Sequence, residues 1–322
     1  MLQFSVIIPT YNRAEFLKRC LNSVLACSLE NIEVLVSDNA SPDTTQEVLR
    51  SFTDSRLRFW RNETNIGAER NILNLLRAAK AEWVFCLGDD DFLLPNSLER
   101  LADILKSDTE IGVVLSNHES YDPNGNFISR SCFHNRTTRF PAGMEALSHM
   151  VWAAHVFSKI CLRRKWLDLD GIERNLESMY PQMYAVGSVV RDHPGLFVDE
   201  CFVGMTANSQ RFWEYPKDFM VAGRILLIKD MLAGPRWKTE RETLIRQVID
   251  SVSGSSYSMT MAWSSSARNW IATQIALVRI REVAFSPRYW QGLMRFIAVK
   301  VYEGLIRKVL VLIPVQRPVK RN

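Results

Sequence analysis

The sequence predicts an α/β protein with a mostly parallel sheet covered by helices on both faces, followed by a helical C-terminal region. Between Phe4 and Ser116, short β-branched runs alternate with segments whose apolar residues repeat at helical spacing. Of the 322 residues, 47% are hydrophobic and 23% are charged, which is typical of a folded chain and excludes a disordered one. From about Pro216 the sequence becomes helical and basic.

The first strand is expected at Phe4–Ile8, which is a short apolar run. A helix follows to Leu25, with Asn12 as its expected N-cap because Glu15 stands three residues later. The remaining expected elements, in chain order, are strand 33–37, helix 43–52, strand 57–61, helix 68–79, strand 83–87, helix 96–106 and strand 111–116. Strands joined by helices in this way form parallel sheets.

Beyond Tyr121 the alternation weakens. Asp122-Pro-Asn-Gly125 is a turn signal, and residues 142–165 read as a helix followed by a short strand. The expected division is a catalytic domain at 1–215 and a smaller basic helical region at 216–322.

The cysteines and the N-terminus favour a cytoplasmic protein. The six cysteines show no C-x-x-C spacing, so neither a zinc site nor a disulfide framework is expected. Residues 1–11 carry no basic leader and no cleavage site, so a signal peptide is not expected. No run of about 18 apolar residues occurs, which argues against a transmembrane helix.

The charge is distributed unevenly. Up to Thr206 the chain has 21 Lys and Arg against 27 Asp and Glu, whereas the remainder has 19 against 8. A basic rear part implies an anionic partner: a nucleic acid, a phosphorylated substrate or a membrane surface.

Three polar loops follow predicted strands, at Pro9–Arg13, Asp38–Ser41 and Gly88–Asp91. In open α/β sheets, ligands bind beyond the carboxyl ends of the strands. In an extended segment, Asp89 and Asp91 would share one side while Asp90 points elsewhere. Carboxylates select Mg²⁺ or Mn²⁺, which bridge substrate phosphates. The alternative is a solvated acidic turn that caps the helix beginning near Asn96.

Four motifs between Ser5 and Asn117 resemble the family 2 glycosyltransferases, which have the GT-A fold, a Rossmann-like sheet flanked by helices. The motifs are Val6-Ile-Ile-Pro-Thr-Tyr-Asn12, Val34-Leu-Val-Ser-Asp-Asn-Ala-Ser41, Asn65-Ile-Gly-Ala-Glu-Arg-Asn71 and Leu87-Gly-Asp-Asp-Asp-Phe-Leu-Leu-Pro95. The Gly-Asp-Asp-Asp form is similar to the subgroup that adds sugars such as abequose during bacterial O-antigen assembly.

The resemblance implies a nucleotide-sugar site and a Mn²⁺ or Mg²⁺ cofactor. The family often has an acidic residue where Gly88 stands, which shifts the aspartate motif by one position, so all three aspartates are named. The implied nucleotide-sugar-binding residues are Pro9, Thr10, Tyr11, Asp38, Arg70, Asp89 and Asp90, and the implied metal ligands are Asp91 and Asp89.

Inverting sugar transfer needs a general base for the acceptor hydroxyl. The Glu-Asp pair that the family often carries is missing here, so Glu177, before the helical-looking segment 179–190, is the first candidate, and Asp170 is the second. Both also read as ordinary surface carboxylates. The five histidines show no metal-ligand grouping, and Arg211 is a candidate for contact with the diphosphate.

These features predict an inverting, metal-dependent glycosyltransferase that moves one sugar from a nucleotide diphosphate sugar to a glycan or lipid-linked saccharide. A sugar-nucleotide pyrophosphorylase is the rival enzyme, but the Pro9–Arg13 loop lacks the glycines of that class. A degenerate glycan-binding or scaffold subunit is the non-enzymatic alternative.

The C-terminal segment from Arg288 has the pattern of a basic amphipathic helix. Trp290, Met294 and Ile297 share a helical face with Val301 and Leu305, and the basic residues lie opposite. Such a helix can lie on an anionic bilayer. The sequence therefore predicts a cytoplasmic enzyme with peripheral contact to the inner face of the cell membrane and no nucleic-acid partner. The alternative is a helix packed on the catalytic domain.

Overall fold

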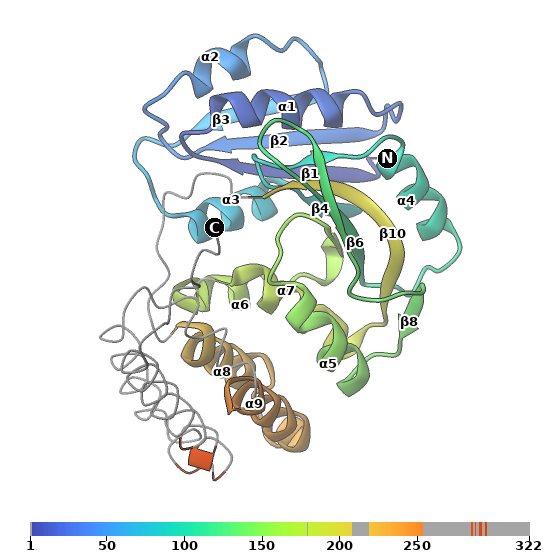
Figure 1. The fold of residues 1–322 in the computed structure, drawn as a ribbon, viewed down its shortest axis with the longest axis vertical. Helices are drawn as coiled ribbons and strands as arrows, with labels where there is room; N and C mark the ends of the chain where they lie inside the picture. The colour runs from blue at the N-terminus through green and yellow to red at the C-terminus, as the bar shows by residue number, and fades with distance from the viewer. Residues whose placement is uncertain are drawn as a thin grey trace, which may run out of the picture. The chain divides into compact units, whose positions relative to one another are not determined.

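The computed structural model describes residues 2–178, 180–207 and 219–253, together with Phe285, Pro287, Trp290, Gln291 and Met294 (Figure 1). The chain divides into two compact units. The first comprises Met1–Glu214 with Lys229–Ala233, and the second comprises Tyr215–Ile228 with Gly234–Asn322.

The first unit is built on one mixed sheet, which has ten strands among the described residues. The strand order is β3-β2-β1-β4-β9-β6-β10-β5, with β7 paired to β6 and β8 paired to β10. The strands are β1 Phe4–Thr10, β2 Ile32–Asp38, β3 Leu57–Arg61, β4 Trp83–Cys86, β5 Phe92–Leu93, β6 Val113–Tyr121, β7 Phe127–Ser131, β8 Thr138–Phe140, β9 Ile160–Arg163 and β10 Gly195–Thr206. The pairs β1–β2, β1–β4 and β2–β3 are parallel, whereas β9 runs antiparallel to both β4 and β6.

The predicted α/β class is therefore confirmed. The expected N-cap of the first helix is wrong, because α1 (Ala14–Leu25) is preceded by Arg13, while Asn12 has a φ of 57°. Asp43, from the loop before α2 (Thr45–Arg50), accepts a hydrogen bond of 3.0 Å from the Ala14 amide. A side chain that is distant in sequence thus supplies the acceptor expected from Asn12.

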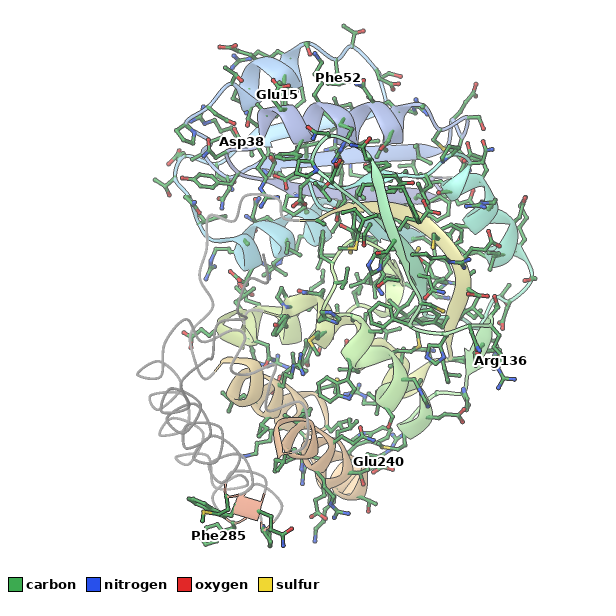
Figure 2. All side chains as sticks on the ribbon, viewed as in Figure 1. Glu15, Asp38, Phe52, Arg136, Glu240 and Phe285 are labelled. Atoms are coloured by element: carbon green, nitrogen blue, oxygen red, sulfur yellow. The ribbon has the colours of Figure 1, made fainter. Side chains whose placement is uncertain are left out.

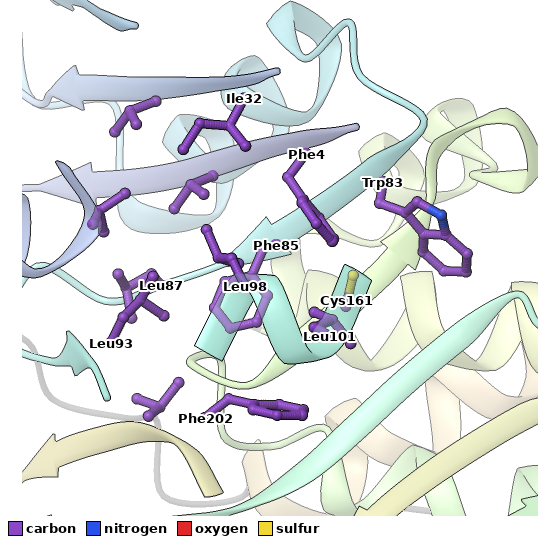
Figure 3. Packing of buried hydrophobic residues seen from close by; sticks show 14 of the residues in the cluster. Phe4, Ile32, Trp83, Phe85, Leu87, Leu93, Leu98, Leu101, Cys161 and Phe202 are labelled. Atoms are coloured by element: carbon purple, nitrogen blue, oxygen red, sulfur yellow. The ribbon is translucent and has the colours of Figure 1, made fainter. Parts of the chain in front are cut away.

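Helices cover both faces of the sheet. On one face, α1 and α4 (Ser97–Lys106) insert apolar side chains into a core with the inner strands, including Phe4, Phe85 and Phe202 (Figure 3). On the other, α3 (Ala68–Ala78) packs on β1 and β2 and also contacts α6 (Leu169–Arg174) and α7 (Pro181–Asp192). The helix α5 (Met144–Ala153) packs against α7 and β10. Short 3₁₀ turns lie at Arg164–Trp166 and Leu176–Ser178.

Two further helices follow the sheet. The helix α8 spans Phe219–Met231 and, after a 3₁₀ turn at Pro235–Trp237, α9 spans Lys238–Ser253. The buried residues of α9 are Leu244, Ile245, Val248 and Ile249, which share one helical face. No helix among the described residues is long and apolar enough to cross a bilayer.

Candidate active site

The carboxyl ends of the parallel strands β1, β2 and β4 bring the three polar loops to one edge of the sheet. The Asn39 amide donates to the Thr10 carbonyl at 2.9 Å, and the Asn12 amide donates to Ser41 Oγ at 2.9 Å. These bonds fix the loop after β1 against the loop after β2. The Tyr11 amide lies 3.4 Å from Asp89 Oδ2, which ties the first loop to the aspartates as well.

Residues 88–91 form a tight turn, which we call the acidic turn. The Asp91 amide donates to the Gly88 carbonyl at 3.1 Å, so the segment doubles back after β4. The extended geometry expected from the sequence is therefore wrong, and side chains at alternate positions do not simply share a side. A turn of this kind brings three consecutive carboxylates close together.

Arg13 neutralises two of these carboxylates. Its guanidinium is ion-paired with Asp90 and lies 3.4 Å from Asp89 Oδ1. The Arg13 side chain is only 4% exposed, so water screens these pairs weakly. Burial and the neighbouring Asp90 nevertheless raise the pKa of Asp89 to about 7. Sequence reasoning placed Arg13 in a ligand-binding loop but missed this pairing.

Asp91 is hydrogen-bonded to a residue of β10, a strand that β9 and β6 separate from β4 in the sheet. The Thr206 amide, at the end of β10, donates to Asp91 Oδ1 at 2.9 Å. Burial, with Asp90 beside it, raises the pKa of Asp91 to about 8, against the lowering effect of a hydrogen bond from Ser158. Arg19 on α1 donates to the Asp90 carbonyl at 3.0 Å and stacks over the Phe92 ring. Sequence reasoning missed Ser158, Thr206 and Arg19, because nothing near them in the chain indicates these contacts.

Gly88 allows two carboxylates and a hydroxyl to converge. A Cβ at this position would lie 3.0 Å from Asp90 Oδ1, 3.0 Å from Ser158 Oγ and 3.4 Å from Asp91 Oδ2. The Gly88 amide itself donates to Ser158 Oγ at 2.7 Å. Any larger residue would push the oxygens apart, which accounts for glycine where the family often has an acid.

This donor set fits a divalent cation that a substrate helps to hold. In the described part of the chain, no group of three or more His, Cys, Asp or Glu residues is arranged to bind a metal. However, Mg²⁺ commonly uses one or two carboxylates and takes its other ligands from phosphates and water. Asp90 and Asp91 offer hard oxygens of this kind, and such an ion would neutralise the charge of a diphosphate.

Asp38 lies at the end of β2 (Figure 2) and its carboxylate is fully buried. It accepts hydrogen bonds from the Ser41 amide at 2.9 Å and from Gln46 Nε2 at 2.7 Å. In this structure, therefore, Asp38 shapes the loop at the sheet edge and does not face open space. Pro9 and Thr10 lie within β1 itself, directly before Tyr11.

The motif Asn65–Asn71 is explained by an asparagine network that joins the β2 loop to α3. Asn71 is buried and donates to the Ser37 carbonyl at 2.9 Å, and Asn62 Nδ2 bridges to Asn71 and Asn39. Asn39 Nδ2 donates to Asn65 Oδ1 at 2.8 Å. Arg70 lies on the exposed side of the first turn of α3.

The two general-base candidates are exposed. Asp170 is in the first turn of α6 and Glu177 is in the 3₁₀ turn before α7. Among the described residues, no hydrogen bond or ion pair joins either carboxylate to the acidic turn. Arg211, the candidate for contact with the diphosphate, lies outside the described residues.

Curated proteins with similar sequences are bacterial glycosyltransferases. The chain is 28% identical to the abequosyltransferase RfbV of Salmonella typhimurium over 200 residues, which cover 58% of this chain and 60% of that protein. It is 30% identical to the glycosyltransferase GlyG of Streptococcus pneumoniae over 126 residues, 38% of this chain and 42% of that protein. The chain thus spans less than two thirds of the length of these relatives.

Solved structures show the same fold. The crystal structure of residues 1–349 of S. aureus TarS in complex with UDP matches 89% of this chain and 81% of that chain, with a TM-score of 0.68 and 17% identity. The same protein in complex with UDP-GlcNAc gives a TM-score of 0.66 at 16% identity, over 84% of this chain and 79% of that chain. The predicted GT-A fold is thereby confirmed. The profile of Glycosyl transferase family 2 matches residues 5–168, about half of the sequence, and the chain belongs to this family.

Proposed function

We propose that the chain transfers a single sugar, with inversion, from a nucleotide diphosphate sugar to a glycan or lipid-linked saccharide during synthesis of a bacterial surface polysaccharide. The observation that carries this proposal is the acidic turn, which sits at the end of β4 beside the Tyr11 loop with Asp90 and Asp91 oxygens converging over Gly88. The relationship to an abequosyltransferase supports an O-antigen type of product.

Each part of the site has a role in the proposed reaction. Thr10, Tyr11 and Arg70 contact the nucleotide, and Asp38 holds the base side of the pocket in shape through Ser41 and Gln46. Asp89 and Asp90 face the ribose or the donor sugar. Asp91, with Asp89 beside it, would hold a Mn²⁺ or Mg²⁺ ion, which would supply positive charge to the diphosphate leaving group.

The remaining step is removal of the proton from the acceptor hydroxyl. We assign this step first to Glu177 and second to Asp170. Both are exposed carboxylates, so a bound acceptor can reach their oxygens.

A thermal-shift panel tests donor binding. The full chain is heated with UDP, CDP, GDP or dTDP, with and without Mn²⁺. A ligand that binds only the folded state raises the melting temperature, and at 100 times its Kd the stabilisation is about 2.7 kcal/mol. We expect one nucleotide to stabilise the protein more than the other three, and only when Mn²⁺ is present. No stabilisation by any of the four would contradict the proposal.

A further inference from the structure

Lys159 occupies an unusual position beside the candidate active site. It follows Ser158, whose hydroxyl contacts the acidic turn, and its amide donates to the Cys86 carbonyl at the end of β4 at 3.3 Å. Its side chain is 1% exposed, and among the described residues its Nζ atom has no hydrogen-bond partner. An unpaired ammonium group in such a place costs folding free energy.

The backbone at Lys159 is also strained. Its φ of 121° lies in a region that residues with a side chain rarely adopt. Strain of this kind concentrates at ligand sites. Burial lowers the pKa of Lys159 to about 7, which is a further measure of how poorly its charge is compensated. Two aromatic rings compensate part of the charge: the centroid of Phe133 is 3.6 Å from Nζ, and that of Phe197 is 5.9 Å from it.

A second unpartnered nitrogen lies at the same place. His118 on β6 is 7% exposed, and its Nδ1 has no hydrogen-bond partner in the described part of the chain. Its ring centroid is 6.0 Å from that of Phe133, and the His155 ring is 6.1 Å from Phe133 on another side. Burial, with Lys159 nearby, lowers the pKa of His118 to about 4. Lys159, His118, His155 and Phe133 together form what we call the Lys159 cluster.

The order of strands separates this cluster from the nucleotide loops. The Tyr11 and Asp38 loops follow β1 and β2, the acidic turn follows β4, and the Lys159 cluster lies past β4, at β9 and β6. The Lys159 cluster therefore lies at strands other than those whose loops carry Tyr11 and Asp38, which are the residues assigned to the nucleotide. A group bound at the cluster is accordingly assigned to the acceptor and not to the nucleotide.

We propose that the Lys159 cluster binds a negatively charged group of the acceptor, a sugar carboxylate or a phosphate ester, with Lys159 Nζ and His118 Nδ1 facing its oxygens. This inference rests on the proposed function, because it assigns the charge class of the acceptor for the same reaction. The Phe133 ring is 40% exposed and lies against Nζ, so this ring must move for an anion to reach the ammonium group. The bound anion then replaces the ring as the partner of the ammonium group.

The test compares anionic with neutral sugars on the full chain. Binding of glucuronate, glucose 6-phosphate and glucose is measured by ligand-observed NMR, with and without UDP and Mn²⁺. We expect at least one anionic sugar to bind and glucose to bind at least tenfold more weakly, since a hydrogen bond to a charged group commonly contributes tenfold or more. Glucuronate distinguishes a carboxylate site from a phosphate site. Equal affinities for the three sugars would overturn the proposal.

Variants of the cluster residues test whether Lys159 and His118 are responsible for binding of the anionic sugar. Lys159→Met keeps the volume of the side chain and should weaken binding of the anionic sugar about tenfold or more, whereas Lys159→Arg should keep it within a few fold. His118→Gln probes the same cluster without changing the lysine, and a several-fold loss is expected. Lys165→Met is the matched control, because Lys165 is an exposed lysine that also lies over an aromatic ring, that of Trp166.

The outcome separates this inference from the proposed function. UDP with Mn²⁺ should bind Lys159→Met as it binds the parent chain. If UDP binds and anionic sugars behave as glucose does, the acceptor assignment fails and donor binding stands. If anionic sugars bind through Lys159 and no nucleotide binds, the proposed function fails. A Lys159→Met chain that binds the anionic sugar as well as the parent does would contradict the assignment of the lysine.

Discussion

The amide of Thr206 donates a hydrogen bond to Asp91 Oδ1 although 115 positions separate the two residues in the sequence. The bond places the carboxylate proposed to hold the cation at the end of both β4 and β10. Because an asparagine Oδ1 accepts the same bond, the charge of Asp91 can be removed without removing this contact.

Asp91→Asn should therefore fold normally and lose transfer activity by about 100-fold or more, since an electrostatic contribution to the leaving group is removed. Its stabilisation by nucleotide should no longer depend on Mn²⁺. Asp103→Asn is the control, because Asp103 is an exposed residue of α4 paired only with Lys106 at the helix surface. Full activity in the Asp91 variant, or parent activity unchanged by EDTA, would remove Asp91 from the metal site.

Arg13→Gln should destabilise the chain by about 3 kcal/mol, because it leaves the buried Asp89 and the partly buried Asp90 beside each other without their counter-ion. The free energy of unfolding is measured with denaturant. Arg58→Gln removes a half-exposed arginine from the buried Glu33, which keeps its hydrogen bonds from Ser5 and the Lys80 amide, and should cost less than Arg13→Gln. Mn²⁺ with nucleotide should stabilise the Arg13 variant more than it stabilises the parent chain. Similar losses of folding free energy in the two arginine variants would contradict the role of Arg13.

The raised pKa values of Asp89 and Asp91 predict how stability changes with pH. In the folded state these groups hold their protons to about pH 7 and about pH 8, whereas in the unfolded chain they lose them near pH 4. Their contribution is therefore fully present below pH 4 and is lost as the pH rises to about 8. The stability of the parent relative to Asp91→Asn should fall over this range when no metal is present. A constant difference between the two chains would refute the pKa assignment.

Glu177→Gln should lower turnover by about 10²-fold or more and leave donor binding unchanged, because general-base catalysis typically contributes 10² to 10⁴. Steady-state rates and nucleotide binding are measured on the same preparation. An unchanged rate would move the assignment to Asp170, and Asp170→Asn then provides the corresponding measurement.

The C-terminal segment should bind anionic liposomes at low salt and release them at high salt. The predicted basic amphipathic helix lies outside the described residues, apart from three positions: Trp290, which is 42% exposed, Gln291, and Met294, which is 62% exposed. Replacing Arg288, Arg295, Lys300 and Arg307 by Gln should abolish sedimentation with the liposomes, since each basic residue contributes about 1 kcal/mol. A full-length chain that ignores anionic liposomes at low salt would show that this segment has another role.

The sequence predicted the parallel half of the sheet because each strand and helix there has its own local pattern of apolar residues. It also identified the loops that meet at Tyr11, Asp38 and Asp89. It predicted a short strand at the end of residues 142–165, which is β9, but not that this strand lies antiparallel between β4 and β6, because the sequences of β4 and β6 do not indicate which strand separates them.

The contacts within the site were harder to foresee than the loops. Arg13, Ser158 and Thr206 reach the acidic turn from three distant segments, and pairing at such separations is decided by tertiary structure. The extended backbone expected for residues 89–91 was wrong for a local reason: the bond from the Asp91 amide to the Gly88 carbonyl makes a turn where an extended strand was assumed.

The pairing of β5 with β10 determines how late in protein synthesis this site can form. Phe92 and Leu93, directly after the acidic turn, pair with Gly204 and Val203. After the three aspartates have been synthesised, the ribosome must add more than a hundred further residues before β10, the strand that pairs with β5, is complete. This takes on the order of ten seconds. During that interval the nascent chain carries the three aspartates without the strand that pairs with β5 and without Thr206, whose amide holds Asp91. The acidic turn can therefore reach its folded geometry only after synthesis has passed Thr206.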